Sequence, residues 1–213
     1  MYQVYHRRLA DSSEESGKVM KMKKGMNVVC LGDSITAGVQ INSSDKWITI
    51  LNRESKFTYL NKGIPGDTTG GMLARMQRDV IESDASNVLV MGGWNDLIAG
   101  VSPGVIQSNI MALVHQAWFH KIVPIVGIPM FFEPSMISKE WREFINFQEL
   151  EKHVRQYQKW LHQFSKIFHT EVVDFEEGLQ VLGTKSREDY LLDGLHPNEA
   201  GNLLMAKWIL RHE

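Results

Sequence analysis

The stretch MNVVCLGDSIT, residues 26–36, sets an almost continuous apolar run directly before a glycine, an aspartate and a serine. A short apolar run of this kind is typical of a parallel strand that is covered on both faces. Ser34 is therefore expected at the carboxyl end of a buried strand, which is where open α/β sheets bind their ligands. If a helix begins behind the strand, the free N–H groups of its first turn favour negative charge near the serine oxygen.

Strand-like runs and helical periodicity alternate along the rest of the chain. The strand-like runs cover residues 26–32, 57–61, 87–92, 122–128 and 170–175. The helical stretches cover residues 36–54, 69–83, 103–119, 140–168 and 197–211. This alternation predicts a doubly wound parallel sheet between two layers of helices.

An acid and an imidazole stand three residues apart near the far end of the chain, in the stretch DGLHP, residues 193–197. A serine hydroxyl is a poor nucleophile at neutral pH and needs a base within hydrogen-bond reach. His196 is the usual kind of base, and an acceptor on its second ring nitrogen would hold it in one tautomer. Asp193 is placed to be that acceptor if Gly194 allows a tight turn, and Pro197 suits the first position of a following helix.

Two further loops offer hydrogen-bond donors, and each follows a strand-like run. The stretch NKGIPGD covers residues 61–67, and GGWND covers residues 92–96. Acyl transfer needs donors directed at the oxyanion of the tetrahedral intermediate. The unshielded backbone N–H of Gly66 and the side-chain amide of Asn95 are candidates for that role.

Four motifs in chain order, G-D-S-I-T, N-x-G-x-x-G-D, G-W-N-D and D-x-x-H-P, resemble the SGNH (GDSL) hydrolase superfamily. The resemblance covers residues 26–211. It implies a flavodoxin-like three-layer αβα sandwich, in which a five-stranded parallel sheet has the strand order 2-1-3-4-5. The catalytic loops would then all lie at the carboxyl edge of the sheet.

The resemblance also implies a catalytic triad of Ser34, Asp193 and His196, with an oxyanion hole formed by the N–H groups of Ser34 and Gly66 and the amide of Asn95. The chain would be a serine esterase or acylhydrolase that cleaves a carboxylic ester or a thioester through an acyl-enzyme, with no cofactor. Acetylated sugars, lysophospholipids, thioesters and simple esters are all open as small-molecule substrates. The alternative is a non-catalytic flavodoxin-like module that binds a small ligand or a protein partner at the same crevice.

Three aromatic residues are candidates for substrate binding. Trp94 adjoins Asn95, and an indole ring beside the oxyanion hole would favour short acyl groups over long ones. Phe131 and Phe132 lie in the apolar segment 129–137 behind the fourth strand-like run. That segment has three open interpretations: core packing, a lining for an acyl pocket, or an exposed patch for a homodimer.

A second serine motif, GVSPG at residues 100–104, fits the nucleophile elbow of α/β-hydrolases. That motif requires a strand immediately before it, whereas residues 95–99 are predicted to form a loop. Ser102 followed by Pro103 instead predicts the N-cap and first residue of a helix. Asp33 and Asp96 are predicted to be structural hydrogen-bond acceptors rather than catalytic acids.

The composition favours one domain and argues against several classes of function. A chain of 213 residues suits a single α/β unit, and its net charge of −2 gives no reason to expect nucleic acid as a partner. No apolar run approaches the roughly 18 residues of an integral membrane segment. The eight histidines lack metal-binding spacings, so no metal is expected. Cys30, the single cysteine, is predicted to be a buried strand residue, which suits a cytoplasmic location.

Residues 1–25 match no part of the family pattern and are interpreted as an N-terminal extension, with the hydrolase domain at residues 26–213. The extension carries six basic and three acidic residues. The apolar run behind it is shorter than the roughly 7 to 15 residues of a secretory signal. A true start at Met20, Met22 or Met26 is the alternative.

Overall fold

A computed structural model describes residues 27–213, so the predicted extension at residues 1–25 lies outside the described residues. One sheet holds five strands: β1 (Asn27–Gly32), β2 (Thr58–Gly63), β3 (Asn87–Met91), β4 (Val123–Ile128) and β5 (Glu171–Asp174). The strand order is β2-β1-β3-β4-β5, and every neighbouring pair is parallel. The predicted fold class and strand order are therefore confirmed.

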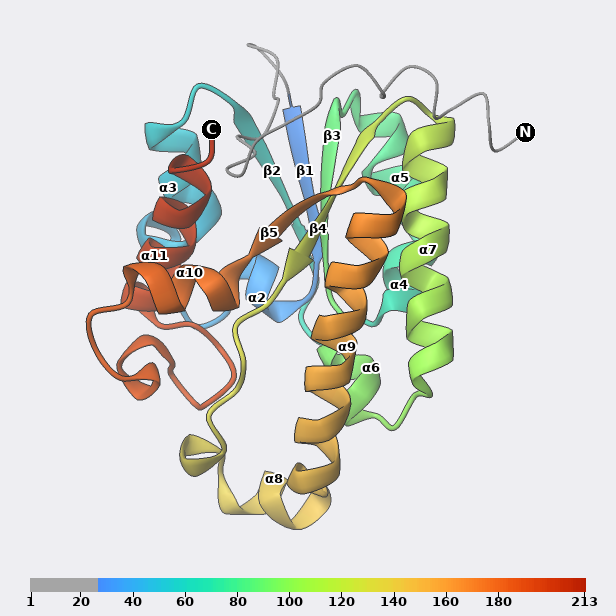
Figure 1. The fold of residues 1–213 in the computed structure, drawn as a ribbon. Coiled ribbons are helices and arrows are strands. Elements are labelled where there is room, and N and C mark those ends of the chain that lie inside the picture. The colour runs from blue at the N-terminus through green and yellow to red at the C-terminus, as the bar shows by residue number, and fades with distance from the viewer. Residues whose placement is uncertain (1–26) are drawn as a thin grey trace.

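Two layers of helices cover the sheet (Figure 1). One layer consists of α3 (Trp47–Glu54), α10 (Phe175–Leu182) and α11 (Glu199–Leu210). The other consists of α4 (Thr69–Ala74), α5 (Met76–Asp79), α7 (Pro103–Phe119) and α9 (Phe147–Phe168). Three short helices, α2 (Ser34–Ala37), α6 (Trp94–Ile98) and α8 (Lys139–Phe144), lie in the connections that follow β1, β3 and β4.

The core forms where the apolar strands meet the apolar faces of these helices. The central strands β1 and β3 are buried over almost their whole length, because helices cover both of their faces. Helix α9 contributes an apolar stripe at helical spacing, and Leu150, Val154, Tyr157, Leu161 and Phe164 on it are all buried. Fully burying an aliphatic or aromatic side chain stabilises a fold by about 1.5–3 kcal/mol, so this stripe holds α9 on the sheet.

Three of the predicted helices were too long. The stretch 36–54 is divided because Gly38 ends α2 in the left-handed conformation and α3 begins only at Trp47. The stretch 69–83 is divided at Arg75, whose backbone interrupts the helix between α4 and α5. The stretch 140–168 is divided at Ile145, which is extended and precedes the cap of α9.

Two further helices were not predicted. Residues 95–99 were expected to form a loop, yet most of them belong to α6. Helix α10 follows β5 directly, because the Asp174 side chain accepts hydrogen bonds from the N–H groups of Glu176 and Glu177 at 2.9 and 3.0 Å. An aspartate followed by acidic residues is a helix-start signal, so this helix was predictable from the sequence.

The strand register brings three loops together at one edge of the sheet. Gly32, the last residue of β1, pairs with Gly63 at the end of β2 and with Met91 at the end of β3. The chain segments behind these residues therefore leave neighbouring strands at the same level. Ser34, Gly66 and Asn95 belong to these three segments, which places all three near one another.

Candidate active site

Ser34 is the first residue of α2, and Asp33 caps that helix. The Asp33 side chain accepts a hydrogen bond from the Ile35 N–H at 2.9 Å, and the carbonyl of Asp33 accepts one from the N–H of Ala37. Asp33 is 2% exposed, and this burial raises the pKa of its carboxyl to about 6. Its predicted role as a structural acceptor fits these contacts.

His196 and Asp193 form a hydrogen-bonded chain with the serine. The Nε2 atom of His196 lies 2.9 Å from the Oγ atom of Ser34, and its Nδ1 atom lies 2.7 Å from the Oδ2 atom of Asp193. The Oδ1 atom of Asp193 accepts the N–H groups of Leu195 and His196 at 3.0 and 2.8 Å. Partial burial raises the pKa of Asp193, but the hydrogen bonds from His196 and Leu195 outweigh it and lower the pKa to about 2. The carboxylate that faces the imidazole is therefore charged at neutral pH.

The loop that carries His196 is held from two sides. Gly194 has a φ of 87°, a left-handed conformation that favours glycine, and its carbonyl accepts the Glu133 N–H at 2.7 Å. The Leu192 N–H donates to the His196 carbonyl at 2.8 Å. Helix α11 begins at Glu199 with Asn198 as its cap, so Pro197 is not its first residue as was predicted.

Trp47, at the start of α3, links the two ends of the chain at this site. Its indole N–H donates to the carbonyl of Ile35 in α2 at 3.2 Å. Its backbone N–H donates to the Oδ1 atom of Asn202 in α11 at 3.0 Å. The helix of Ser34 and the helix that follows His196 are thus both bonded to one fully buried residue.

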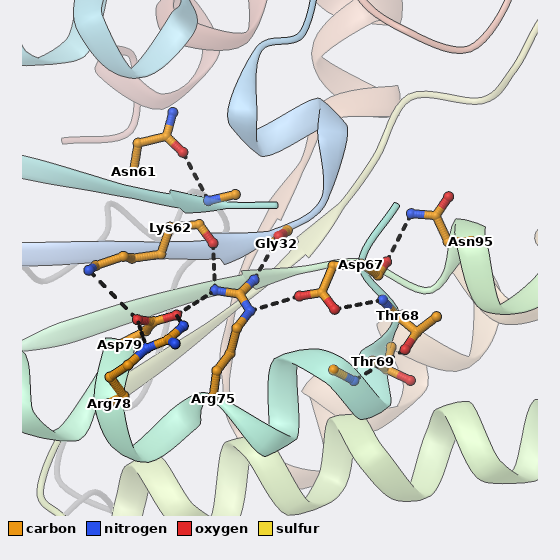
Figure 2. Close-up of polar contacts among 12 residues, drawn as sticks. Gly32, Asn61, Lys62, Asp67, Thr68, Thr69, Arg75, Arg78, Asp79 and Asn95 are labelled. Carbon is orange, nitrogen blue, oxygen red and sulfur yellow. Dashed lines mark hydrogen bonds and ion pairs between the residues drawn. The ribbon is translucent and has the colours of Figure 1, made fainter. Parts of the chain in front are cut away.

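Gly66 and Asn95 lie on the two loops that flank the serine loop. Gly66 has a φ of 78°, is exposed, and has open space where a side chain would begin. The Nδ2 atom of Asn95 donates to the carbonyl of Asp67 at 2.8 Å, which fixes the orientation of the amide (Figure 2). An amide NH₂ group carries two donor hydrogens, so one of them is left for a ligand.

Thr69 and Tyr157, which the sequence did not single out for the site, support the loop that carries Asn95. The carboxylate of Asp96 accepts the backbone N–H of Thr69 at 2.9 Å and its hydroxyl at 2.6 Å. The hydroxyl of Tyr157 donates to the carbonyl of Gly92 at 3.0 Å. Asp96 is an acceptor as predicted, whereas no local pattern in the sequence marks Thr69 or Tyr157.

Trp94, Phe131 and Phe132 form one aromatic cluster. The Trp94 ring lies edge-on to both phenylalanines, with centroids 6.2 and 5.6 Å away, and the two phenylalanine rings stack at 4.6 Å. Trp94 is only 3% exposed, and both phenylalanines are buried as well. The burial of these rings agrees with the core-packing interpretation of the segment 129–137. Their role in substrate binding stays a prediction.

Ser102 lies where a helix starts rather than at an elbow. It precedes α7, with Pro103 in the first turn, and the element before it is α6 rather than a strand. The nucleophile elbow needs a strand at that point, so the geometry of GVSPG does not fit it.

No group of three or more histidine, cysteine or carboxylate side chains within residues 27–213 is arranged to hold a metal ion. In the same residues, no helix has the length and apolar character that crossing a membrane requires.

A five-stranded parallel sheet of this order is shared with solved structures of the G-D-S-L family, and in this chain the serine behind the first strand is bonded to a histidine near the far end. The model of the GDSL-like Lipase/Acylhydrolase family matches residues 30–204, and the chain belongs to this family. The matched region includes every residue predicted for the triad and the oxyanion hole.

Two relatives show how far the sequence similarity extends. Esterase TesA of Pseudomonas aeruginosa is 30% identical over 95 residues, which are 42% of this chain and 47% of that protein. The chain thus matches about half the length of that esterase. Thioesterase 1/protease 1/lysophospholipase L1 of Escherichia coli K12 is 24% identical over 192 residues, which are 86% of this chain and 81% of that protein.

Solved structures share the fold. A protein of the G-D-S-L family from Desulfitobacterium hafniense superimposes with a TM-score of 0.74 at 24% identity, over 89% of this chain and all of that one. Axe2, an acetylxylan esterase from Geobacillus stearothermophilus, superimposes with a TM-score of 0.71 at 21% identity, over 91% of this chain and 96% of that one.

Proposed function

We propose that this chain is a serine esterase that cleaves a small carboxylic ester or thioester through an acyl-enzyme. The observation that carries the proposal is the hydrogen-bonded order of Ser34, His196 and Asp193, with 2.9 Å from hydroxyl to imidazole and 2.7 Å from imidazole to carboxylate. A serine becomes a nucleophile when a neighbouring base accepts its proton, and an acceptor on the other ring nitrogen keeps that base in the required tautomer.

In the acylation step, the Oγ atom of Ser34 attacks the ester carbonyl and His196 takes the hydroxyl proton at Nε2. The negative charge that develops on the carbonyl oxygen is stabilised by the N–H groups of Ser34 and Gly66 and by the free amide hydrogen of Asn95. The tetrahedral intermediate expels the alcohol or thiol, which receives the proton from His196.

In the deacylation step, His196 takes a proton from water, whose oxygen attacks the acyl carbonyl. The tetrahedral intermediate then releases the acid, and the Oγ atom of Ser34 receives the proton back from His196. Asp193 stays a carboxylate throughout and stabilises the charged imidazolium in both steps. Its low pKa supports this role because the group is ionised at any pH at which the enzyme is expected to work.

A labelling experiment tests the proposal. A fluorophosphonate probe should modify the parent protein at Ser34, and the parent should hydrolyse p-nitrophenyl acetate. Ser34→Ala should abolish both signals, whereas the matched control Ser102→Ala should retain both. A folded parent protein that neither reacts with the probe nor cleaves any member of a panel of acetylated sugars, lysophospholipids, thioesters and simple esters would support the alternative, a non-catalytic module.

The aromatic cluster of the site supports a proposal for the substrate class. Short acyl esters, including acetylated sugars, are favoured because the rings of Trp94, Phe131 and Phe132 are buried and packed against one another, so that a long acyl chain would have to displace them. The similarity to Axe2, which is an acetylxylan esterase, and to a thioesterase names two classes for the panel. The cytoplasmic location and the homodimer stay predictions, to be tested by cell fractionation and by light scattering.

A further inference from the structure

One buried arginine lies behind the three loops of the site. The Arg75 side chain is 8% exposed and donates four hydrogen bonds (Figure 2). Its Nη2 atom donates to the carbonyl of Gly32 at 2.9 Å, and its Nη1 atom donates to the carbonyl of Lys62 at 2.8 Å. Its Nε atom donates to the carboxylate of Asp67 at 2.7 Å, and Nη1 also reaches the carboxylate of Asp79 at 2.8 Å.

Three of these four acceptors border the proposed oxyanion hole. Gly32 ends the strand that leads to Ser34. Lys62 and Asp67 stand on the two sides of Gly66, so the guanidinium holds that loop at both ends. The carbonyl of Asp67 also accepts the Asn95 amide at 2.8 Å, which connects the third loop to the same group.

We propose that Arg75 is a positioning residue that sets the three oxyanion donors relative to one another by bonding Gly32, Lys62 and Asp67 at once. The proposal rests on the oxyanion hole of the proposed function. Oxyanion donors must lie about 2.7–3.1 Å from the developing charge, so the loops that carry them need a common reference. A planar guanidinium with five donors in a fixed geometry supplies one, and a lysine ammonium does not.

The charges around Arg75 keep it in this position. Asp67 and Asp79 flank it, and their side chains are 11% and 6% exposed. Hydrogen bonds from Arg78, together with those from Arg75, hold the pKa of Asp79 far below its ordinary value in spite of partial burial. The Asp79 carboxylate therefore stays charged at neutral pH and balances the arginine, with which it forms an ion pair at 2.8 Å. The backbone break between α4 and α5 falls at Arg75 itself.

Arg78 offers a matched control, because it belongs to the same ion-pair cluster but reaches none of the loops. Its guanidinium contacts Asp79 at 2.8 and 2.9 Å, and its side chain is 69% exposed. Arg75→Lys keeps the positive charge but loses the planar guanidinium and its fixed set of donors. Arg78→Gln removes a charge and leaves every loop contact in place.

Steady-state kinetics on a p-nitrophenyl ester then separate positioning from mere stability. Arg75→Lys should lower kcat about 10²-fold with KM nearly unchanged, since a misplacement of about 1 Å costs that much. Arg78→Gln should leave kcat at the parent value. In the double variant with Asn95→Ala, the combined loss should be smaller than the product of the two single losses, because both changes act on the same oxyanion contacts. Asp67→Asn keeps the backbone contact to Asn95 and should also lower kcat. It takes the place of Arg75→Lys in this test if Arg75→Lys does not fold.

A second readout does not depend on activity. In a ¹⁵N NMR spectrum, Arg75→Lys should shift the Gly66 amide and the Asn95 side-chain amide, and Arg78→Gln should leave both unchanged. Unshifted signals in a folded Arg75→Lys protein, or losses of kcat that multiply with Asn95→Ala, would overturn the positioning role. A parent protein without esterase activity would instead contradict the proposed function, and the NMR comparison would still decide whether Arg75 sets the loops.

Discussion

Replacing Asp193 by asparagine would separate two tasks of one side chain, since the carboxylate both builds the loop and sets the imidazole tautomer. Its Oδ1 atom accepts two backbone N–H groups, and its Oδ2 atom faces the Nδ1 atom of His196. Asparagine keeps an oxygen for the two N–H groups, so its NH₂ group faces Nδ1. The imidazole must then carry its proton on Nε2, where it is unable to accept the proton of Ser34.

The backbone of the loop decides which way the new amide points. The opposite orientation would set the NH₂ group against the N–H groups of Leu195 and His196, and two lost hydrogen bonds cost about 1–3 kcal/mol together. At about 1.4 kcal/mol for each factor of ten, the productive tautomer would fall by roughly 10- to 100-fold. Loss of the carboxylate charge that stabilises the imidazolium adds to this, and we expect kcat to fall about 10⁴-fold, the scale of this change in a Ser-His-Asp triad.

The assay is the kcat for p-nitrophenyl acetate, with urea unfolding to show that the variant is folded and ¹⁵N NMR of the imidazole to identify its tautomer. Asp193→Ala is the comparison, because it loses the two loop hydrogen bonds as well and should be less stable. A folded Asp193→Asn enzyme whose kcat stays within about tenfold of the parent would refute the reasoning, since the tautomer would then not limit the reaction.

Three other changes test separate parts of the site. Asn95→Ala should lower kcat by about 10² to 10³ with little change in KM, the cost of one oxyanion donor, and an unchanged kcat would remove Asn95 from the oxyanion hole. Burial raises the pKa of Asp33 to about 6 from an ordinary 3.8, so the folded protein loses stability as the pH rises from about 4 to 6. The free energy of unfolding in urea should therefore be about 1–3 kcal/mol higher for Asp33→Asn than for the parent at pH 7.5, and the two values should become similar near pH 4. Across p-nitrophenyl esters, kcat/KM should favour acetyl to butyryl over longer chains in the parent, and Trp94→Phe should shift the optimum toward longer ones; a parent that prefers octanoyl contradicts this assignment of Trp94.

The sheet was predictable because burial on both faces leaves a direct mark on the sequence. Each central strand is a run of apolar residues ended by a glycine, as in residues 26–32 and 87–92, and the two runs become β1 and β3 with ends within one residue of the prediction. Ser34, Asp193 and His196 were also recognisable because short motifs carry them. Their catalytic roles stay predictions until the labelling experiment is done.

The parts of the site that were missed depend on contacts between distant residues. Arg75 lies in a stretch with helical periodicity, and nothing local marks it, because the residues that it bonds are set apart at positions 32, 62, 67 and 79. The same contacts explain why the predicted helix 69–83 is interrupted there. The packing of Trp94 against Phe131 and Phe132 was not predictable either, because the segment 129–137 meets Trp94 only in the folded chain.

The bonds of Trp47 have a consequence for how the protein acquires activity during folding. The serine and the histidine are 162 positions apart, and the helices next to them are both bonded to this one tryptophan. A chain that has formed its central strands but has not yet docked α11 has a hydroxyl with no base beside it. Recovery of ester hydrolysis during refolding should therefore follow the docking of the last helix, while circular dichroism follows the earlier appearance of strands and helices. For the esterase proposed above, the rate at which hydrolysis recovers would therefore report the rate of the last folding step.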